Sequence, residues 1–280
     1  MHHQEQIYRH LKFLAVERDP FLHSSHYFFA RTYIQTEMKR FGRVEVQRSP
    51  SPYGALENII LHLPCLNPDR RPVIIGAHYD TVPGTCGADD NASGVAVLLT
   101  LAETLYSQPL KTPVRLIAFD LEEYGLLGSH AYVESIKANK EKVQLVVSLE
   151  MLGYISESPD SQKYPPGLQY LYPNQGNFIA LVGNLRSVPA MHRMRQALTS
   201  AGTPCRWLPV PMQGKPLPIT RRSDHAPFWD NGYPAIMMTD TADLRNPHYH
   251  KSSDTIDTLN FDFMANLTIG LASEIQRIAL

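Results

Sequence analysis

The sequence predicts an α/β protein: a three-layer α/β/α sandwich around a mixed, mostly parallel central sheet. Three observations support this. Strand-like segments alternate with longer helical segments, the pattern typical of layered α/β folds. The run at 72–78 is continuously apolar, as expected of a strand buried on both faces. No internal repeat or low-complexity linker divides the chain, so we expect one domain over residues 1–280.

Each expected element has a local signal. Ile7, Leu11 and Leu14 recur at helical spacing, and a second helix is expected from about 25 to 40, before Gly42. Asn91 is expected to cap a helix. The remaining strands are expected at 44–47, 56–63, 72–78, 114–119, 144–149, 177–183 and 235–238, and the remaining helices at 92–107, 126–138, 189–201 and from 261 onward.

Composition excludes several classes of protein. Of the 280 residues, 43% are hydrophobic and 19% charged, which is typical of a folded chain. The 26 basic and 27 acidic residues leave no basic field, so no nucleic-acid partner is expected. Three cysteines exclude a disulfide framework and a four-cysteine zinc site.

The location is predicted from what the sequence lacks. No apolar run reaches the roughly 18 residues of a membrane-spanning helix, so no membrane partner is expected. The first residues do not form a signal peptide, so the chain as given is expected to be cytoplasmic. The processed form of an exported protein would look the same. The sequence leaves the oligomeric state open.

Prolines gather in two segments, near 154–176 and 203–234, where we expect loops. Thirteen of the 22 prolines lie between Pro159 and Pro247. Loops of this length in a compact domain commonly line a binding site, so we expect these two beside the active site. Plain surface insertions are the alternative. Aromatic residues that could line a pocket there are Tyr164, Tyr170, Tyr172 and Phe228.

Acidic and histidine residues follow the expected strands, at the edge where open α/β sheets bind ligands. Each has an ordinary structural explanation alone: a strand-end histidine can be a hydrogen-bonded structural residue, and an Asp pair before a helix can be a cap. These explanations do not account for several carboxylates buried together at one edge of the sheet, because buried carboxylates require cations. The residues concerned are His78, Asp80, Asp89, Asp90, Glu122, Glu123, Glu150, His248 and His250.

These motifs offer no lysine or arginine as counter-charge, so a divalent metal is expected. Mixed imidazole and carboxylate ligands without thiolate suit zinc, with cobalt or manganese as possible substitutes. Neither a nucleophilic G-x-S-x-G motif nor a phosphate-binding glycine loop is present.

The motifs also carry a family resemblance. GAHYDTVPGTCGADDNASG, FDLEEYGLLGS, SLEMLGY, SDHAPFWDNGYPAI and YHKSSDT resemble, in order and spacing, the motifs of the dinuclear-zinc aminopeptidases, metallopeptidase family twenty-eight. The resemblance extends from about Asn58 to Asp257. It implies a zinc-exopeptidase-like fold, two zinc ions, and removal of the first residue from a peptide with a free N-terminus.

Carried onto this chain, the resemblance implies five metal ligands: His78 and Glu150 for one ion, Glu123 and His250 for the other, and Asp89 bridging both. Glu122 would be the general base. Asp80 would fix the orientation of His78. The family also implies a cis peptide bond at Asp89–Asp90.

Some assignments stay open at this stage. His248 and His250 would face the same way in an extended segment, so either could be the ligand. The position of Glu150 is Asp in some relatives, which leaves the preferred N-terminal residue undetermined.

Competing functions of the same fold are glutaminyl cyclase, carboxypeptidase or dipeptidase. A metal-free binding domain is a competitor from another class. The Asp-Asp pair in GADDNASG and the Glu-Glu pair in DLEEYG favour the aminopeptidase over the cyclase. A plausible residue at every ligand position argues against the metal-free domain.

Overall fold

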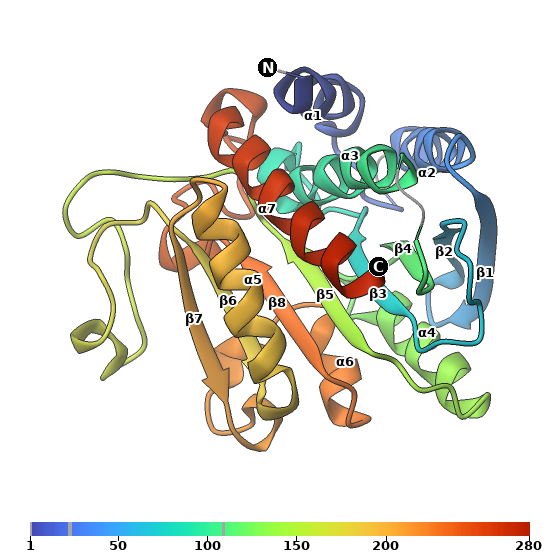
Figure 1. Ribbon diagram of the computed structural model, residues 1–280. Coiled ribbons are helices and arrows are strands. Elements are labelled where there is room, and N and C mark those ends of the chain that lie inside the picture. Colours follow the sequence, from blue (N-terminus) through green and yellow to red (C-terminus); the bar gives the residue numbers. More distant parts are fainter. Residues whose placement is uncertain (1, 22–23, 108–109) are drawn as a thin grey trace.

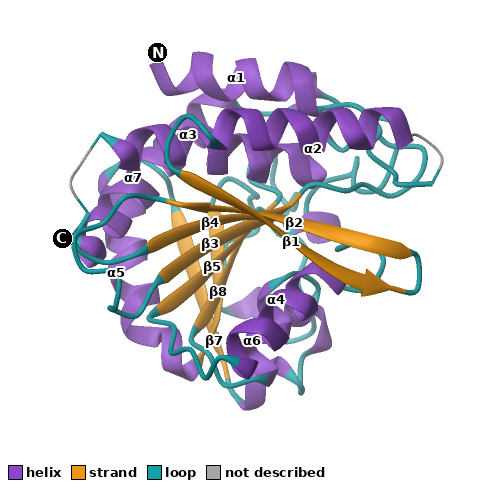
Figure 2. Ribbon diagram, turned by 90° about the vertical axis from the view of Figure 1, so that its right-hand side faces the viewer, coloured by secondary structure: helices purple, strands orange, loops and turns teal. Residues whose placement is uncertain are grey.

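A computed structural model describes residues 2–21, 24–107 and 110–280. Over these residues eight strands form one sheet with helices on both faces, which confirms the expected fold class (Figures 1 and 2). The sheet order is β1-β2-β4-β3-β5-β8-β6-β7. The strands are β1 (Arg43–Ser51), β2 (Gly54–His62), β3 (Val73–His78), β4 (Val114–Phe119), β5 (Leu145–Glu150), β6 (Ile179–Asn184), β7 (Cys205–Val210) and β8 (Ala235–Thr239).

The four central strands, β4, β3, β5 and β8, run parallel to one another, while β1, β2 and β6 supply the antiparallel pairs. The central strands are almost entirely buried, as their continuous apolar sequences predict. Because parallel strands end at the same edge, the residues after β3, β4 and β5 meet there.

Helices cover the two faces unequally (Figure 2). On one face α3, α5 and α7 pack against the sheet, α2 packs against β2, and α1 lies outside on α3 and α7; on the other face lie α4 and α6. The helices are α1 (His2–Leu14), α2 (Ser24–Met38), α3 (Gly94–Tyr106), α4 (Leu127–Ala138), α5 (Val188–Ser200), α6 (His225–Asp230) and α7 (Phe261–Ala279). The turn Ala88–Ser93 precedes α3 directly, and its residues Asp90 and Asn91 have non-helical backbone angles.

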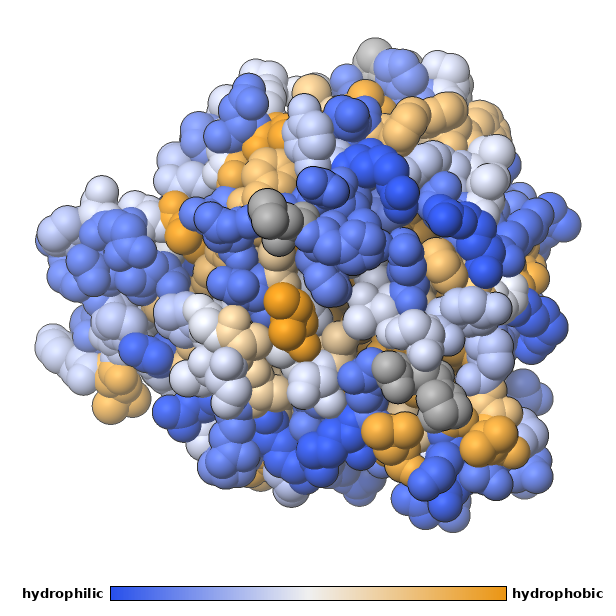
Figure 3. Space-filling model, turned by 45° about the horizontal axis from the view of Figure 1, so that its top comes forward, coloured by the Kyte–Doolittle hydropathy of each residue, from blue (hydrophilic) through white to orange (hydrophobic). Residues whose placement is uncertain are grey.

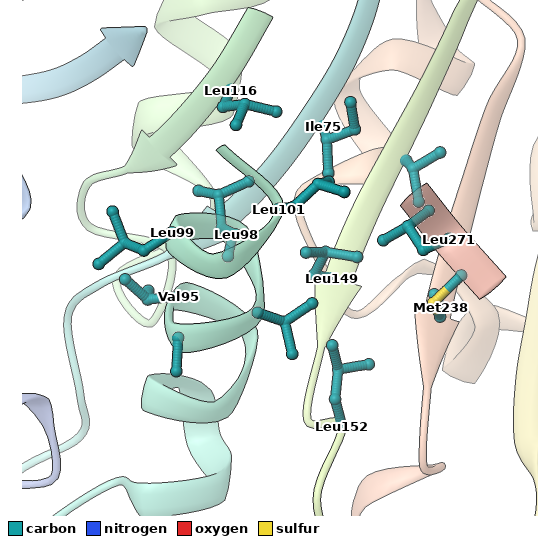
Figure 4. Close-up of a cluster of buried hydrophobic side chains, with 14 of the residues drawn as sticks. Ile75, Val95, Leu98, Leu99, Leu101, Leu116, Leu149, Leu152, Met238 and Leu271 are labelled. Carbon is teal, nitrogen blue, oxygen red and sulfur yellow. The ribbon is translucent and has the colours of Figure 1, made fainter. Parts of the chain in front are cut away.

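The main core fills the space between the sheet and α3 (Figure 4). Alternation along β3 sends Ile75 into this core and Ile74 into the smaller core beneath α4 and α6. Leu98 and Leu101 of α3 pack against the sheet with Leu149 of β5. Each fully buried aliphatic side chain contributes about 2 kcal/mol to stability, so this packing fixes the position of the turn before α3.

The second proline-rich segment is not one continuous loop as expected. Its residues 205–210 form β7, an edge strand, and residues 225–230 form α6. Pro209 concealed the strand, because proline is tolerated only on sheet edges and suggests a loop. The other edge strand, β1, carries Arg43, Glu45 and Arg48.

The face seen in Figure 3 is mainly hydrophilic, with apolar residues in small separate groups. None of the helices in the described ranges has the length and apolar content to cross a membrane.

Candidate active site

Three neighbouring strands bring a group of histidine and carboxylate side chains together. β3 ends at His78 and β5 ends at Glu150, while Glu122 and Glu123 follow β4. We call the group the histidine–carboxylate cluster; its members are His78, Asp90, Glu122, Glu123, Glu150 and His250. The prediction that strand ends place these residue types at one edge is confirmed.

Asp90 lies between the two imidazoles. Its Oδ1 is 3.3 Å from Nε2 of His78, and its Oδ2 is 3.1 Å from Nε2 of His250. On the His78 side, Nε2 is also 3.6 Å from Glu150 Oε2 and 4.0 Å from Glu122 Oε2. On the other side, Nε2 of His250 is 3.4 Å from Glu123 Oε2. The cluster therefore offers two sets of donor atoms that share Asp90.

Asp89, expected as the bridging residue, lies outside the cluster. Its Oδ1 accepts a 2.8 Å hydrogen bond from the backbone N–H of Gly153, and its Oδ2 accepts one of 2.8 Å from the side-chain amide of Asn246. Asp90, and not Asp89, is the aspartate that faces both imidazoles. The expected cis peptide bond also lies one residue later, at Asp90–Asn91.

Asp254, to which sequence analysis assigned no role, orients this turn. Its carboxylate accepts hydrogen bonds from the backbone N–H groups of Asp89 at 2.8 Å and Asp90 at 3.1 Å. Burial raises its pKa to about 7, and the charge of Asp89 adds to the effect. The only sequence signal was its place in the KSSDT motif.

Asn91 anchors the same turn to α3 and β5. Its Oδ1 accepts bonds of 3.1 Å from the N–H groups of Gly94 and Met151, and its side-chain amide donates to the carbonyl of Leu149 at 2.8 Å. Asn91 therefore accepts a bond at the start of α3, as a cap does.

Asp80 connects three members of the cluster, and the resemblance implied only the first of these contacts, with His78. Its Oδ1 lies 3.4 Å from Nδ1 of His78. Its two oxygens also accept the backbone N–H groups of Glu122 at 3.0 Å and Glu123 at 3.1 Å. One buried carboxylate thus orients the imidazole and the loop that carries both glutamates.

Arg18 is a fully buried residue that sequence reasoning missed. It lies in the segment between α1 and α2, and its guanidinium donates to the backbone carbonyls of Leu14, Val16, Tyr79, Cys86 and Gly87. Burial lowers its pKa to about 10, which still leaves it charged at neutral pH. Arg18 ties the first helix to the loops on either side of Asp80. Because its partners are carbonyls, no residue pattern could have revealed it.

The cluster has a strongly negative potential. Burial alone would lower the pKa of His78, yet the charges of Glu122 and Glu150 raise it well above its ordinary value. Burial also opposes protonation of His250, but hydrogen bonds with Asp90 and Glu123 raise its pKa to about 10. A potential that holds protons on both imidazoles equally favours metal cations.

The pKa values of the cluster carboxylates shift in opposite directions. Burial raises the pKa of Glu123 to about 7, with the charge of Asp90 adding to the shift. Burial also opposes ionisation of Asp90, but the imidazoles of His250 and His78 close to its two oxygens hold its pKa below the ordinary value. Burial raises the pKa of Glu122 well above its usual range. Glu122 is therefore the cluster carboxylate best suited to take up a proton.

Three positions in or next to the cluster have left-handed backbone: Leu121 precedes the two glutamates with φ 51°, Met151 follows Glu150 with φ 51°, and His250 itself has φ 56°. Such conformations are uncommon in residues other than glycine and gather at functional sites. Here they turn the strand-end side chains inward.

Of the two late histidines, His250 is the one that lies in the cluster. His248 is largely outside the cluster, with Nδ1 2.9 Å from the hydroxyl of Ser253. His250 lies against Asp90 and Glu123, and the ring of Tyr249 stacks on it at 3.8 Å. The segment is a turn and not a strand, so the two histidines do not face the same way.

An apolar pocket of about 110 Å³ opens beside Glu150. Both proline-rich segments contribute to its walls, together with residues of β6 and β8. Of the expected aromatic residues, Tyr164 and Tyr172 line it. The other two do not: Tyr170 is 84% exposed on the loop, and Phe228 is buried in the core beneath α4 and α6.

Ser223 lies between the pocket and the cluster, and sequence reasoning overlooked it. Its hydroxyl donates a 2.6 Å hydrogen bond to Oε2 of Glu150, the oxygen that faces His78. A position in the SDHAPF motif was its only signal. Ser223 fixes which way the Glu150 carboxylate points.

The donor atoms fit zinc. Both ring nitrogens of His78 and Oε1 of Glu123 are buried without a hydrogen-bond partner. Across the described ranges no lysine or arginine pairs with a cluster carboxylate. The sets His78, Glu122, Glu150 and His78, Asp90, Glu123 each bring three donor atoms within 4.8 Å of one another. Imidazole and carboxylate donors at such spacing suit a divalent metal.

The fold and the cluster define an α/β protein whose ligand site, rich in carboxylates, lies at the carboxyl edge of the sheet. Residues 58–274 match the model of peptidase family M28, and the chain belongs to that family. It is 40% identical over 243 residues to the uncharacterised protein YfbL of Escherichia coli K12, covering 82% of this chain and 73% of that protein. It is 32% identical to a probable leucine aminopeptidase 1 of Trichophyton verrucosum, covering 75% of this chain and only 56% of that one.

Solved structures share the fold. LapB of Legionella pneumophila matches with a TM-score of 0.78 and 23% identity, covering 99% of this chain and 72% of LapB. BSAP, a zinc aminopeptidase of Bacillus subtilis, matches with a TM-score of 0.61 and 26% identity, covering 81% and 51%. Porphyromonas gingivalis glutaminyl cyclase matches with a TM-score of 0.72 and 18% identity, covering 99% and 97%.

Proposed function

We propose that the protein is a zinc-dependent aminopeptidase that hydrolyses the first peptide bond of peptides with a free N-terminus. The observation that carries this is the position of Asp90, with one oxygen toward each imidazole, next to a pocket the size of one apolar side chain. Membership of a peptidase family and the likeness to leucine aminopeptidases support it.

Two zinc ions would share Asp90. His78 and Glu150 would complete the ligands of one, and Glu123 and His250 those of the other. Asp80 would hold His78 in the orientation that presents Nε2 to the metal. Zinc bound by these residues would polarise the scissile carbonyl and lower the pKa of a water molecule.

Glu122 would act as general base and then as general acid. Its carboxylate is buried beside His78 but takes no part in the Asp90 contacts. Glu122 would accept a proton from the attacking water and deliver it to the leaving amine. Asp80 fixes the backbone of Glu122, so the carboxylate remains in place while the proton moves.

The substrate's first residue would bind between Glu150 and the pocket. Its α-ammonium would face the carboxylates of Glu122 and Glu150, where the potential favours a cation. Its side chain would fill the pocket, where Val182, Leu208 and Met237 favour an apolar group. A peptide can then present only its first bond to Glu122.

The test is mass spectrometry of zinc-loaded protein incubated with short peptides that differ in their first residue, including one that begins with glutamine. We expect stepwise loss of N-terminal residues, abolished by a chelator and by Glu122→Gln. Loss of ammonia from the glutamine peptide alone would replace the proposal with a glutaminyl cyclase. Peptides that remain intact, in a protein that binds no zinc, would indicate a binding domain.

A further inference from the structure

Three aromatic rings from three different segments meet near the cluster. They are Phe21 in the connection between α1 and α2, Tyr53 in the turn between β1 and β2, and Tyr124 directly after Glu123. Their ring centroids are 5.2–5.5 Å apart in all three pairs. Phe21 and Tyr53 are about half exposed, at 49% and 51%. We call this group the aromatic triad.

The sheet places the triad and the pocket on opposite sides of the cluster. β2 runs antiparallel to β4, with Ile59 opposite Ala118, so the β1–β2 turn lies beyond the carboxyl end of β4. Glu122 and Glu123 follow that same end. The pocket is lined instead by residues of β6, β7 and β8. These strands lie on the other side of β5 from β3 and β4 (Figure 1). The order along the edge is therefore triad, cluster, pocket.

Asp19 holds the triad in shape. Its Oδ1 accepts the backbone N–H of Phe21 at 2.8 Å, and its Oδ2 accepts the hydroxyl of Tyr124. The neighbouring Arg18 fixes the backbone of the same segment. The rings are thus pre-organised as well as exposed.

We propose that the aromatic triad binds the part of the substrate that follows the scissile bond. This rests on the proposed function: if the first side chain fills the pocket and the bond lies at the cluster, the remaining peptide leaves past Glu123 toward Tyr124. The second or third residue of the substrate then packs on Phe21 and Tyr53. The preferred substrates are peptides with an aromatic or large aliphatic residue at one of these positions.

The continuity of the triad with the cluster favours a substrate peptide over another occupant. A ring that packs on an exposed aromatic pair gains enough for roughly a five- to tenfold preference. This preference should appear only with peptides that extend beyond the scissile bond, because a substrate that ends at that bond does not reach the triad.

The test compares kcat/KM for Leu-amide, Leu-Ala-Ala-Ala, Leu-Phe-Ala-Ala and Leu-Ala-Phe-Ala with zinc-loaded wild type, Phe21→Ser and Tyr53→Ser. Tyr124 is left intact because it binds Asp19. The matched control is Tyr106→Ser, a residue 52% exposed at the opposite end of α3. Melting temperatures establish that the variants fold.

We expect wild type to prefer a phenylalanine peptide about fivefold over Leu-Ala-Ala-Ala, mainly through KM. Phe21→Ser and Tyr53→Ser should lose this preference and keep wild-type activity on Leu-amide, while Tyr106→Ser keeps both. Cleavage of Leu-amide with no preference at either position, or a preference that survives both variants, overturns the triad proposal alone. Absence of cleavage of every substrate overturns the proposed function, and this inference with it.

Discussion

The side-chain amide of Asn246 donates a 2.8 Å hydrogen bond to Oδ2 of Asp89. The backbone N–H of Gly153 donates a hydrogen bond to the other oxygen, so both carboxylate oxygens of Asp89 are bound by groups around the cluster. Asp90 is left to face both imidazoles. Two adjacent, chemically identical residues thereby take different tasks.

This division predicts different effects on metal content. Asp90→Asn should lose most of the bound zinc, because the shared carboxylate oxygen no longer carries charge. Asp89→Asn should keep its zinc and lose stability instead, since it disturbs a buried hydrogen-bonded group. Zinc per chain measured by atomic spectroscopy, with melting temperatures, checks both. Zinc loss confined to Asp89→Asn would reverse the assignment.

Glu122→Gln should abolish peptide hydrolysis without loss of zinc. The amide cannot take a proton from water, and general acid–base catalysis is commonly worth about 10²–10⁴ in rate. Single-turnover rates and zinc content of the same preparation provide the measurement. As control, Glu134→Gln changes an exposed glutamate of α4 far from the cluster and should alter neither quantity.

Arg18→Met should lower the free energy of unfolding by about 3–5 kcal/mol, because it leaves buried carbonyls without donors. Zinc affinity should fall too, since the loops on either side of Asp80 lose their common anchor. Arg18→Lys keeps the charge but loses the planar fork of donors, so its stability should be intermediate. Denaturant unfolding and competitive zinc titration test this; an Arg18→Met protein as stable as wild type would contradict it.

Ala180→Phe should narrow substrate choice. Ala180 lines the pocket from β6, and a phenyl ring there would fill most of its volume. Leucine buries three more carbons than alanine, worth about 2 kcal/mol, so kcat/KM for Leu-amide should fall roughly 30-fold while Ala-amide is spared. Ala180→Ser is the matched control of similar size. Equal losses on both substrates would mean that the pocket does not select the first residue.

His10 should make stability depend on pH far from the cluster. Burial lowers its pKa to about 3 from the ordinary 6.5, and its Nδ1 lies 2.8 Å from the hydroxyl of Tyr33. The unfolded chain therefore binds the proton first. Neutral His10 therefore makes its full contribution to the free energy of unfolding above pH 6.5. That contribution falls by about 1.4 kcal/mol per pH unit as the pH drops from 6.5 toward 3.

Denaturant unfolding of wild type and His10→Asn across this range isolates the effect, because asparagine retains a group that can bond Tyr33. We expect the stability difference between them to shrink or reverse as the pH falls. His130→Asn, at an exposed position of α4, serves as control. A difference that stays constant from pH 7 to 4 would show that His10 does not titrate as described.

Local sequence patterns predicted most of the fold, and long-range contacts account for what they missed. The continuous apolar run of β3 was sufficient to predict a strand buried on both faces, because such strands have no polar face to alternate with. β7 escaped because Pro209 is a loop signal that an edge strand tolerates. Whether a strand lies at an edge depends on partners far away in the sequence.

The same limit applies to the site. Residue types and strand ends placed all six cluster members among the candidates, but they did not show which aspartate faces the imidazoles or which late histidine joins the cluster. The choice of aspartate depends on Asp254 and Asn246, which are more than 150 residues away in the chain. Arg18 binds carbonyls that any sequence would supply, so only the folded chain reveals it.

The two edge strands influence how the molecules behave at high concentration. An unpaired strand edge invites a second molecule to extend the sheet, which is a common route to aggregation. β1 places alternating charges along one edge, at Arg43, Glu45 and Arg48, and a proline interrupts each edge strand, Pro50 in β1 and Pro209 in β7. Both edge strands therefore resist pairing with a second molecule. The carboxyl ends of the central strands, where the cluster lies, remain open without exposing an unprotected strand.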